Sequence, residues 1–216
     1  MAKCYFCDNE SSSVEHTPPK GFFPKDMRNN LITVPSCPQH NEDTSKDDEY
    51  VRNIITMSIE NNQISIDHFF EKSFKSFKRS PALTSSILNS LTDVSFYKEG
   101  AQSIKFDRRR FDKVIRKISY ALFYHEYGYS WNKLLAVMTN QIKMQDLSND
   151  HLGDLFNTLN EDLDILLMKG DNPNVFQYAF LDVSSDPQDK VLFFIFYEGF
   201  PFWIIPEIKS DHSDFD

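Results

Sequence analysis

The sequence predicts an α+β fold, in which a small N-terminal module of two strands and one helix precedes a larger domain of helices and antiparallel sheet. Two observations lead to this prediction. All three cysteines lie within the first 37 residues, in two short pairs of which the second is completed by a histidine. The remainder is rich in aromatic residues, and its apolar positions alternate in some stretches and recur at helical spacing in others. We therefore expect one module at residues 1–60 and an α+β domain at residues 61–216.

Two pairs of metal-ligand side chains define the N-terminal module. They are Cys4 with Cys7, and Cys37 with His40, each pair separated by two residues. At this spacing two side chains converge on one tetrahedral Zn²⁺, so we expect all four to hold a structural zinc. A segment this short buries too little apolar surface to fold without such a staple. No cysteine remains for a disulfide, which is typical of a reducing compartment, and we expect the protein to be cytoplasmic.

Prolines and a glycine set the boundaries of the elements expected in this module. Short strands are expected at 14–17 and 31–35, and the prolines and glycine at 18–24 predict an irregular loop between them. Pro38 suits the first turn of a helix, which we expect to run through Asn41 and Lys46 and past residue 55.

The larger domain combines helices with a sheet. Residues 108–127 carry apolar side chains at a period near 3.6, which predicts a helix. The alternating aromatic and aliphatic residues at 175–205, with a turn at Glu198-Gly199, predict a buried antiparallel hairpin. Further helices are expected at 64–77, 81–91, 131–144 and 152–168, and a hairpin at 94–106.

Charge is distributed unevenly along the chain. The net charge is -9, yet residues 118–216 hold only 5 of the 23 Lys and Arg and 16 of the 32 Asp and Glu. The first half is thus slightly positive and is the half that would meet a polyanion. No apolar run approaches the ~20 residues of a membrane span, and no signal-peptide core follows the start, so we expect no membrane association.

The order of motifs over about residues 4–46 resembles the HNH endonuclease family. A Cys-x-x-Cys pair is followed by Glu15-His16-x-x-Pro19, by Asn30-Leu31, and by Cys-x-x-His with Asn41 directly after it. The resemblance implies a ββα-metal fold, in which two strands and a helix surround one catalytic divalent cation beside a structural zinc. The second zinc pair here is Cys-His, where Cys-Cys is commoner in the zinc-bearing members.

The resemblance also implies roles for individual residues. His16 matches the general base that activates water, a task for a neutral imidazole near pH 7. Glu15 and Asn41 match the ligands of a catalytic Mg²⁺ or Mn²⁺, which prefers oxygen donors. Asn30 matches the asparagine that braces the loop, with Asn29 as the adjacent candidate. Each has a structural alternative, since His16 suits a core position, Glu15 a surface position and Asn41 a helix cap.

Several basic residues are candidate phosphate contacts. Lys20 and Lys46 lie within the module, and Arg108, Arg109 and Arg110 begin the helix expected at 108–127. A second basic cluster is interleaved with phenylalanines and consists of Lys72, Lys75, Lys78 and Arg79. Such faces neutralise phosphates in nucleic-acid-binding proteins, although charged helix faces are usually only solvated.

The function expected from these observations is that of a metal-dependent HNH endonuclease acting on double-stranded DNA. By analogy alone, it would serve anti-phage defence beside a protein partner such as an ATPase or sensor that docks on the acidic half. Two alternatives stay open. One is a non-catalytic zinc module that binds nucleic acid or a partner protein, and the other is an RNA-cleaving toxin nuclease.

Overall fold

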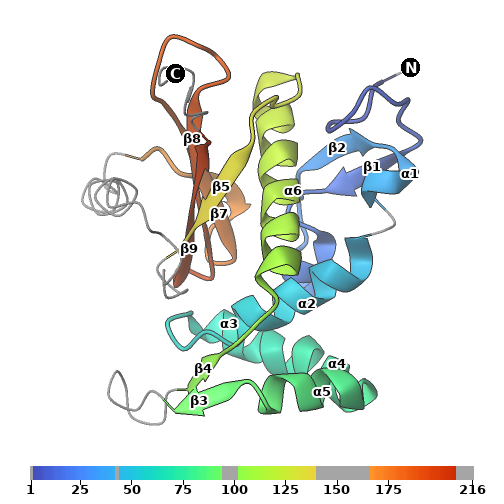
Figure 1. Cartoon of the computed structure of the whole chain (residues 1–216), viewed down its shortest axis with the longest axis vertical. Coiled ribbons are helices and arrows are strands. Elements are labelled where there is room, and N and C mark those ends of the chain that lie inside the picture. Colours follow the sequence, from blue (N-terminus) through green and yellow to red (C-terminus); the bar gives the residue numbers. More distant parts are fainter. Residues whose placement is uncertain (1, 42–43, 94–101, 140–165, 208–216) are drawn as a thin grey trace, which may run out of the picture.

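One long helix organises the fold. The computed structural model describes residues 2–41, 44–93, 102–139 and 166–207, and in it helix α6 (Arg108–Tyr127) stands between a five-stranded sheet and a two-stranded N-terminal hairpin (Figure 1). The Asp107 side chain caps its start by accepting from Arg110 N, and Gly128 ends it in the left-handed region at φ 76°. The helix has the bounds expected from its apolar period. In the described part of the chain, no helix is long and apolar enough to cross a membrane.

The five-stranded sheet is antiparallel throughout, in the order β5-β9-β8-β7-β6. Its strands are β5 (Leu135–Met138), β6 (Lys169–Asn172), β7 (Phe176–Asp182), β8 (Lys190–Phe196) and β9 (Phe200–Pro206). The hairpin expected within 175–205 is confirmed, with Phe194 opposite Phe202 and Phe193 opposite Trp203. Phe194 and Phe202 face the core under α6, while Phe193 and Trp203 belong to a second cluster on the other face. Burial of both faces explains why these strands are almost continuously apolar.

The structure differs from two of the elements expected in the larger domain. The helix expected at 131–144 is wrong over residues 131–139, of which 135–138 form β5 and pair with β9, and residues 140–144 lie outside the described residues. Leu135 and Val137 fill the main core there, so pairing with a distant strand overrides the local helical pattern. Strand β4 (Gln102–Ile104) lies in the hairpin expected at 94–106, but its partner β3 (Leu91–Asp93) precedes that range and takes in Leu91, which was expected to be helical; residues 94–101 lie outside the described part of the chain. The helix expected at 152–168 also lies almost entirely outside them.

The N-terminal hairpin consists of β1 (Ser13–His16) and β2 (Thr33–Ser36), paired antiparallel with His16 opposite Thr33. The two strands expected here are confirmed, with bounds shifted by one or two residues. Short helical turns η1 (Lys20–Phe22) and η2 (Lys25–Met27) form the irregular connection. The single helix expected after Pro38 is divided into α1 (Pro38–Asn41) and α2 (Ser45–Thr56), and residues 42–43 are not described.

A helical layer continues below α2 (Figure 1). It contains α3 (Gln63–His68), a π-helical turn η4 (Phe69–Ser73), α4 (Phe74–Arg79) and α5 (Pro81–Leu88). Helices were expected over these residues, and Asn62 caps the first by accepting from Ser65 N at 3.3 Å.

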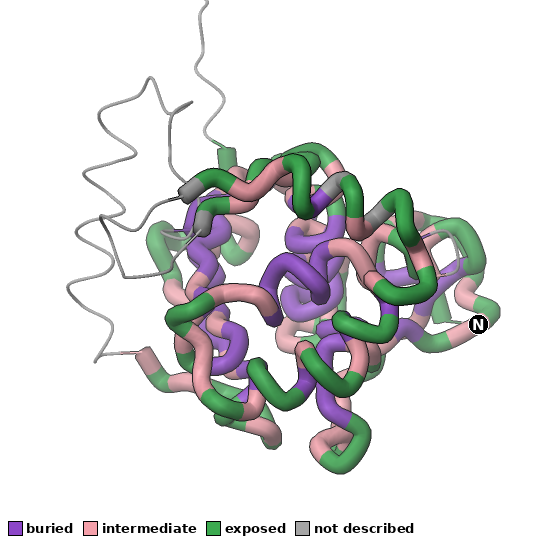
Figure 2. The backbone as a smooth tube through the Cα atoms, turned by 90° about the horizontal axis from the view of Figure 1, so that it is seen from below, coloured by how far each residue is buried: buried purple, intermediate pink, exposed green. Residues whose placement is uncertain are grey.

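One hydrophobic core is shared across the position at which the two expected domains meet. Phe22 and Phe23 of the N-terminal module and Val51 of α2 pack with α6 and the sheet. Buried residues form a continuous interior in Figure 2. The Tyr197 hydroxyl donates to Phe22 O at 2.6 Å, and a side chain at Gly199 would meet Glu60 O at 2.1 Å. The described residues of the N-terminal module are therefore closely packed against the C-terminal strands.

Candidate metal centre and hydrolytic site

Four side chains near the N-terminus converge as the sequence predicts. The ligand atoms of Cys4, Cys7, Cys37 and His40 all lie within 4.8 Å of one another. The Cys7 and Cys37 sulfurs are 3.8 Å apart, and His40 Nδ1 lies 3.5 Å from Cys7 Sγ and 3.2 Å from Cys37 Sγ. A tetrahedron around zinc has edges of about 3.6–3.8 Å, because its Zn–S and Zn–N bonds are about 2.3 and 2.1 Å. The cluster could hold a metal ion and is compatible with structural zinc.

Local structure places these ligands. The turn containing Cys4 and Cys7 closes with Cys4 N donating to Asn9 O at 2.9 Å, and Tyr5 N donates to Pro35 O in β2. Cys37 follows β2 directly, and the single turn of α1 brings His40 back to the same side. Burial lowers the pKa of His40, which favours the neutral imidazole that a metal needs.

The metal centre is docked on α6. Cys4, Tyr5 and Cys37 share a small buried cluster with Ala121 of that helix. The Phe6 ring lies 4.6 Å from the His40 ring and 4.9 Å from Tyr120. The site is thus held by the central helix as well as by its own ligands.

His16 closes β1 and is half-buried. It shares the outward face of the strand with Val14, because residues two apart point to the same side. Within the described residues its ring has no hydrogen-bond partner, so an imidazole nitrogen is open to a ligand. Burial, with a smaller contribution from Lys20, lowers the pKa of His16 below its ordinary value. A neutral, accessible imidazole is what a general base requires near pH 7.

Glu15 points the opposite way, into the protein, and is 5% exposed. Its carboxylate lies 3.3 Å from Lys117 Nζ of α6. The same ammonium donates to Asp48 at 2.8 Å and to Thr44 Oγ1 at 2.8 Å. Burial, opposed by Lys117, raises the pKa of both Glu15 and Asp48. The residue expected to bind a catalytic cation therefore already has a cationic partner.

Asn41 ties helix α1 to the hairpin. Its Nδ2 donates to Ser13 Oγ at 2.8 Å and to Val14 O at 3.2 Å. Val14 precedes His16 by two residues, or about 7 Å of extended strand, so Asn41 lies near the base candidate. Glu15 pairs with Lys117 whereas Asn41 binds Ser13 and Val14, and among the described residues no hydrogen bond joins the two side chains. Glu15 and Asn41 therefore do not form a preformed Mg²⁺ or Mn²⁺ site beside His16.

The asparagines of the connecting loop are exposed. Asn30 has a left-handed backbone at φ 53°, and in the described ranges its side chain makes no hydrogen bond. The expected bracing of the loop by its amide is therefore not formed. The carbonyl of Asn29 accepts from Asn172 of β6 at 3.1 Å, so this loop reaches the sheet by another contact.

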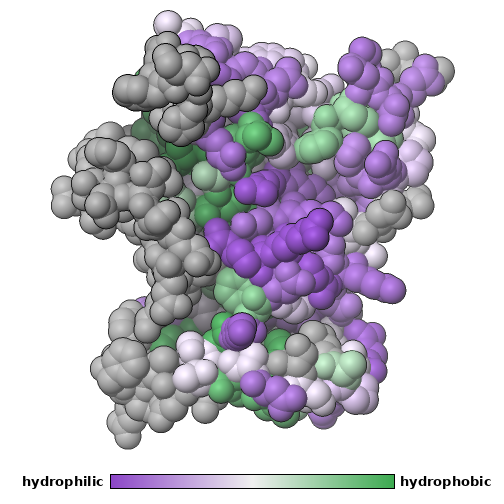
Figure 3. Space-filling model, viewed as in Figure 1, coloured by the Kyte–Doolittle hydropathy of each residue, from purple (hydrophilic) through white to green (hydrophobic). Residues whose placement is uncertain are grey.

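The expected phosphate contacts differ in availability. Lys20 is exposed beside His16, and Lys46 is exposed near the start of α2. Arg108 pairs with Asp112 at 2.6 Å and Arg110 with Asp47 at 2.7 Å, whereas Arg109 is exposed. Hydrophilic side chains gather where α6 crosses α2 (Figure 3). Much of the basic charge on this face is thus balanced by neighbouring carboxylates.

Lys117 was expected on the basic edge of the helix at 108–127, and the sequence prediction missed that it is buried and pairs with Glu15. A signal for it exists, because position 117 falls between the buried Val114 and Ala121 on the apolar stripe of α6. A lysine on such a stripe must find a buried partner, and here the partner is 102 residues away at Glu15.

Comparison with known proteins gives no match, since no protein-family model, no curated protein and no solved structure is similar to the chain.

Proposed function

We propose that this protein is a phosphodiester hydrolase of the HNH type, an endonuclease acting on double-stranded DNA. The observation that supports the proposal best is His16, an accessible and neutral imidazole at the end of a hairpin that the Cys/His cluster fixes to the following helix. The motif order in the sequence adds Asn41 beside it.

In this proposal His16 removes a proton from a water molecule as the water oxygen attacks the phosphorus. The new O–P bond replaces the bond to the 3′-oxygen, leaving a 5′-phosphate and, after protonation, a 3′-hydroxyl. The exposed ammonium of Lys20 beside His16 would attract the phosphate. The family resemblance implies a Mg²⁺ or Mn²⁺ that would stabilise the charge developing on the phosphate, and Glu15 could hold that ion only if it is released from Lys117.

A second candidate, the non-catalytic zinc module, is favoured by one specific observation. Lys117 occupies the Glu15 carboxylate, so that residue is not free to hold a catalytic cation. Such a module would bind nucleic acid or a protein without cleaving anything. The partner ATPase or sensor and the role in defence remain predictions by analogy.

The direct test is cleavage of plasmid DNA by the full chain with Mg²⁺ or Mn²⁺, with EDTA and competing RNA as further arms. We expect His16→Ala to lower the rate about 10²–10⁴-fold, the usual contribution of a general base. His125→Ala is the matched control, because His125 is exposed on α6 and has no expected role. Zinc content should be equal in all three proteins. Equal cleavage by His16→Ala and wild type would exclude the assignment of the base.

The pH dependence gives an independent prediction. Because burial and Lys20 lower the pKa of His16, the base form should persist to lower pH than for an ordinary histidine. The acid limb of kcat/KM should therefore lie below pH ~6.5 and move upward in Lys20→Gln. A pH–rate profile measures both, and an acid limb that stays in place in Lys20→Gln argues against this contribution.

A further inference from the structure

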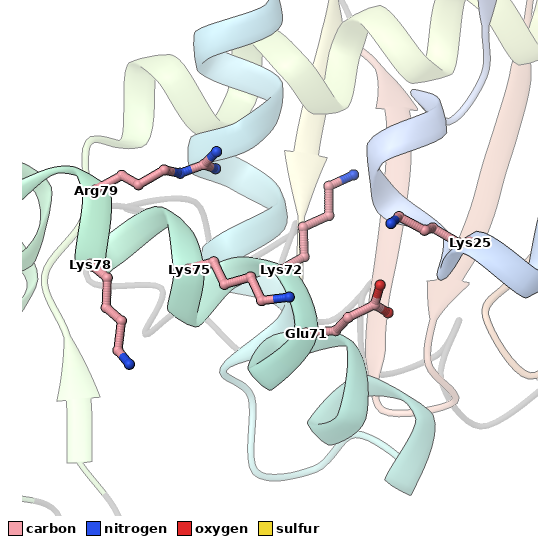
Figure 4. Close-up of a pocket in the computed structure, with 6 residues that line it drawn as sticks. All are labelled: Lys25, Glu71, Lys72, Lys75, Lys78 and Arg79. Atoms are coloured by element: carbon pink, nitrogen blue, oxygen red, sulfur yellow. The ribbon is translucent and has the colours of Figure 1, made fainter.

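A groove lined by positive charge lies beside the connection between β1 and β2. Its volume is about 470 Å³, and Figure 4 shows its six lining residues. These are Lys25, Glu71, Lys72, Lys75, Lys78 and Arg79. Lys25 comes from η2 and the others from the η4–α4 segment, which is outside the HNH-like region. Five of the six side chains are cations, and Lys25 and Lys72 point toward each other across the groove (Figure 4).

The charges of the groove are poorly balanced by the protein itself. In the part of the chain that the structure describes, Lys25, Lys72 and Lys75 have no carboxylate within salt-bridge distance, and the pair of Arg79 with Glu49 is long at 3.9 Å. On α6, by contrast, Arg108 pairs closely with Asp112. Lone cations held close together repel one another, and bound anions relieve that repulsion.

The positive field extends into the interior behind the groove. Burial, together with Arg52 and Arg28, lowers the pKa of Lys72 to about 8. Burial and the same two arginines with Lys72 lower the pKa of His68 to about 3. Arg52 is 4% exposed, and its Nε has no acceptor among the described residues. Arg52 also pairs with Glu49 at 3.5 Å, and it lies behind the groove rather than in its lining, so the unbalanced charge at the wall is that of the lysines.

The groove lies close to the candidate hydrolytic site along the chain. A Cβ built on Gly21 of η1 would be 3.7 Å from Lys72 Nζ and 3.7 Å from Arg52 Nη1. Gly21 follows His16 by five residues, which span at most about 17 Å when extended. At about 3.4 Å per nucleotide along a strand, the distance from His16 to Gly21 at the groove corresponds to roughly five nucleotides or fewer.

We infer that this groove binds the phosphodiester backbone of the substrate strand a few nucleotides from the phosphate at His16. The inference rests on the proposed function, and it assigns substrate positioning to residues 25 and 71–79. The ligand chemistry is that of closely spaced phosphates. A free nucleotide or pyrophosphate carries the same chemistry, and competition separates the two sources.

The test measures binding rather than cleavage. All variants carry His16→Ala, and a fluorescent 20-base-pair DNA is titrated with the full chain at several salt concentrations. We expect Lys72→Gln with Lys75→Gln to weaken binding about tenfold at 0.1 M salt and to reduce the salt slope by about 2, since two phosphate contacts are lost. The matched control, Lys105→Gln with Lys169→Gln, removes two exposed charges that have no expected DNA contact and should change affinity less than threefold.

Each outcome decides the matter. Equal weakening by both pairs would mean that only net charge counts, and would overturn the inference. Displacement of the DNA by micromolar ATP or pyrophosphate would assign the groove to a small phosphate ligand and overturn it as well. If DNA binding depends on the groove residues but the wild-type chain cleaves no plasmid, the groove is a DNA-binding surface and the hydrolase proposal is wrong. If the wild-type chain cleaves plasmid through His16 but the groove variant binds DNA normally, the hydrolase proposal stands and the inference about the groove is wrong.

Discussion

Replacing Cys37 with serine is expected to release the metal and unfold the N-terminal module. Structural zinc contributes about 10–16 kcal/mol of apparent binding free energy in small zinc modules, which is comparable to the whole stability of a domain. The paired strands here are only four residues long, so they cannot hold the loop containing Cys4 and Cys7 without the metal. Because Phe22 and Phe23 belong to the shared core, the damage should spread beyond the module. We expect the melting temperature to fall by about 10 °C or more.

Zinc analysis of the purified chain and thermal unfolding measure this effect together. Wild type should carry one zinc per chain, and Cys37→Ser should carry much less. His40 provides a matched pair of variants. His40→Cys keeps a competent ligand and should retain zinc, whereas His40→Ala should lose it. Full zinc occupancy and an unchanged melting temperature in Cys37→Ser would show that this cluster is not a metal centre.

The metal cluster could be predicted because its signal is local. A loop turn sets the spacing of one pair and a single turn of helix sets that of the other, so Cys37 and His40 can be recognised as ligands without knowledge of the fold. The bounds of α6 were predictable for a similar reason, since its apolar period and its Asp107 and Gly128 caps are written in one continuous segment.

The remaining features depend on contacts between distant segments. Residues 135–138 form a strand because β9, some 65 residues later, supplies their partner. Glu15 is buried because Lys117, 102 residues later, reaches it. Lys25 joins the groove only because η2 is folded against η4 and α4. A single sequence shows which side chains are present but not which of them lie close together. For this reason Glu15 was expected to bind a metal ion, whereas in the structure it pairs with Lys117.

Replacing Lys117 with methionine is expected to destabilise the fold by about 3–5 kcal/mol, because it leaves two buried carboxylates without a counter-charge. The side chains of Lys117 and Glu15 are 8% and 6% exposed, and that of Asp48 is 16% exposed, so water screens their repulsion poorly. Urea unfolding at pH 7 measures the loss. The control is Lys117→Met combined with Glu15→Gln and Asp48→Asn, which removes all three charges and should recover most of the stability.

The pH dependence of the same variant has a defined sign. Burial already raises the pKa of Glu15 and Asp48 in the presence of Lys117, and removal of the ammonium should raise both further. A carboxyl with a raised folded-state pKa binds its proton more tightly when folded, so stability falls as pH rises through its range. The deficit of Lys117→Met should therefore shrink as pH is lowered from 7 toward 5. A deficit independent of pH would mean that the lost packing of the lysine stem, rather than its charge, destabilises the variant.

Divalent ions complete this experiment and bear on the role of Glu15. The ammonium of Lys117 already satisfies the Glu15 and Asp48 carboxylates, so Mg²⁺ or Mn²⁺ should leave the melting temperature of the wild-type chain unchanged in the absence of DNA. In Lys117→Met the carboxylates and the Thr44 hydroxyl are oxygen ligands left without a cation, and the same ions should recover part of the stability. Ion-dependent stabilisation of wild type, lost in Glu15→Gln, would instead show that the metal displaces the lysine and that Glu15 is a metal ligand after all.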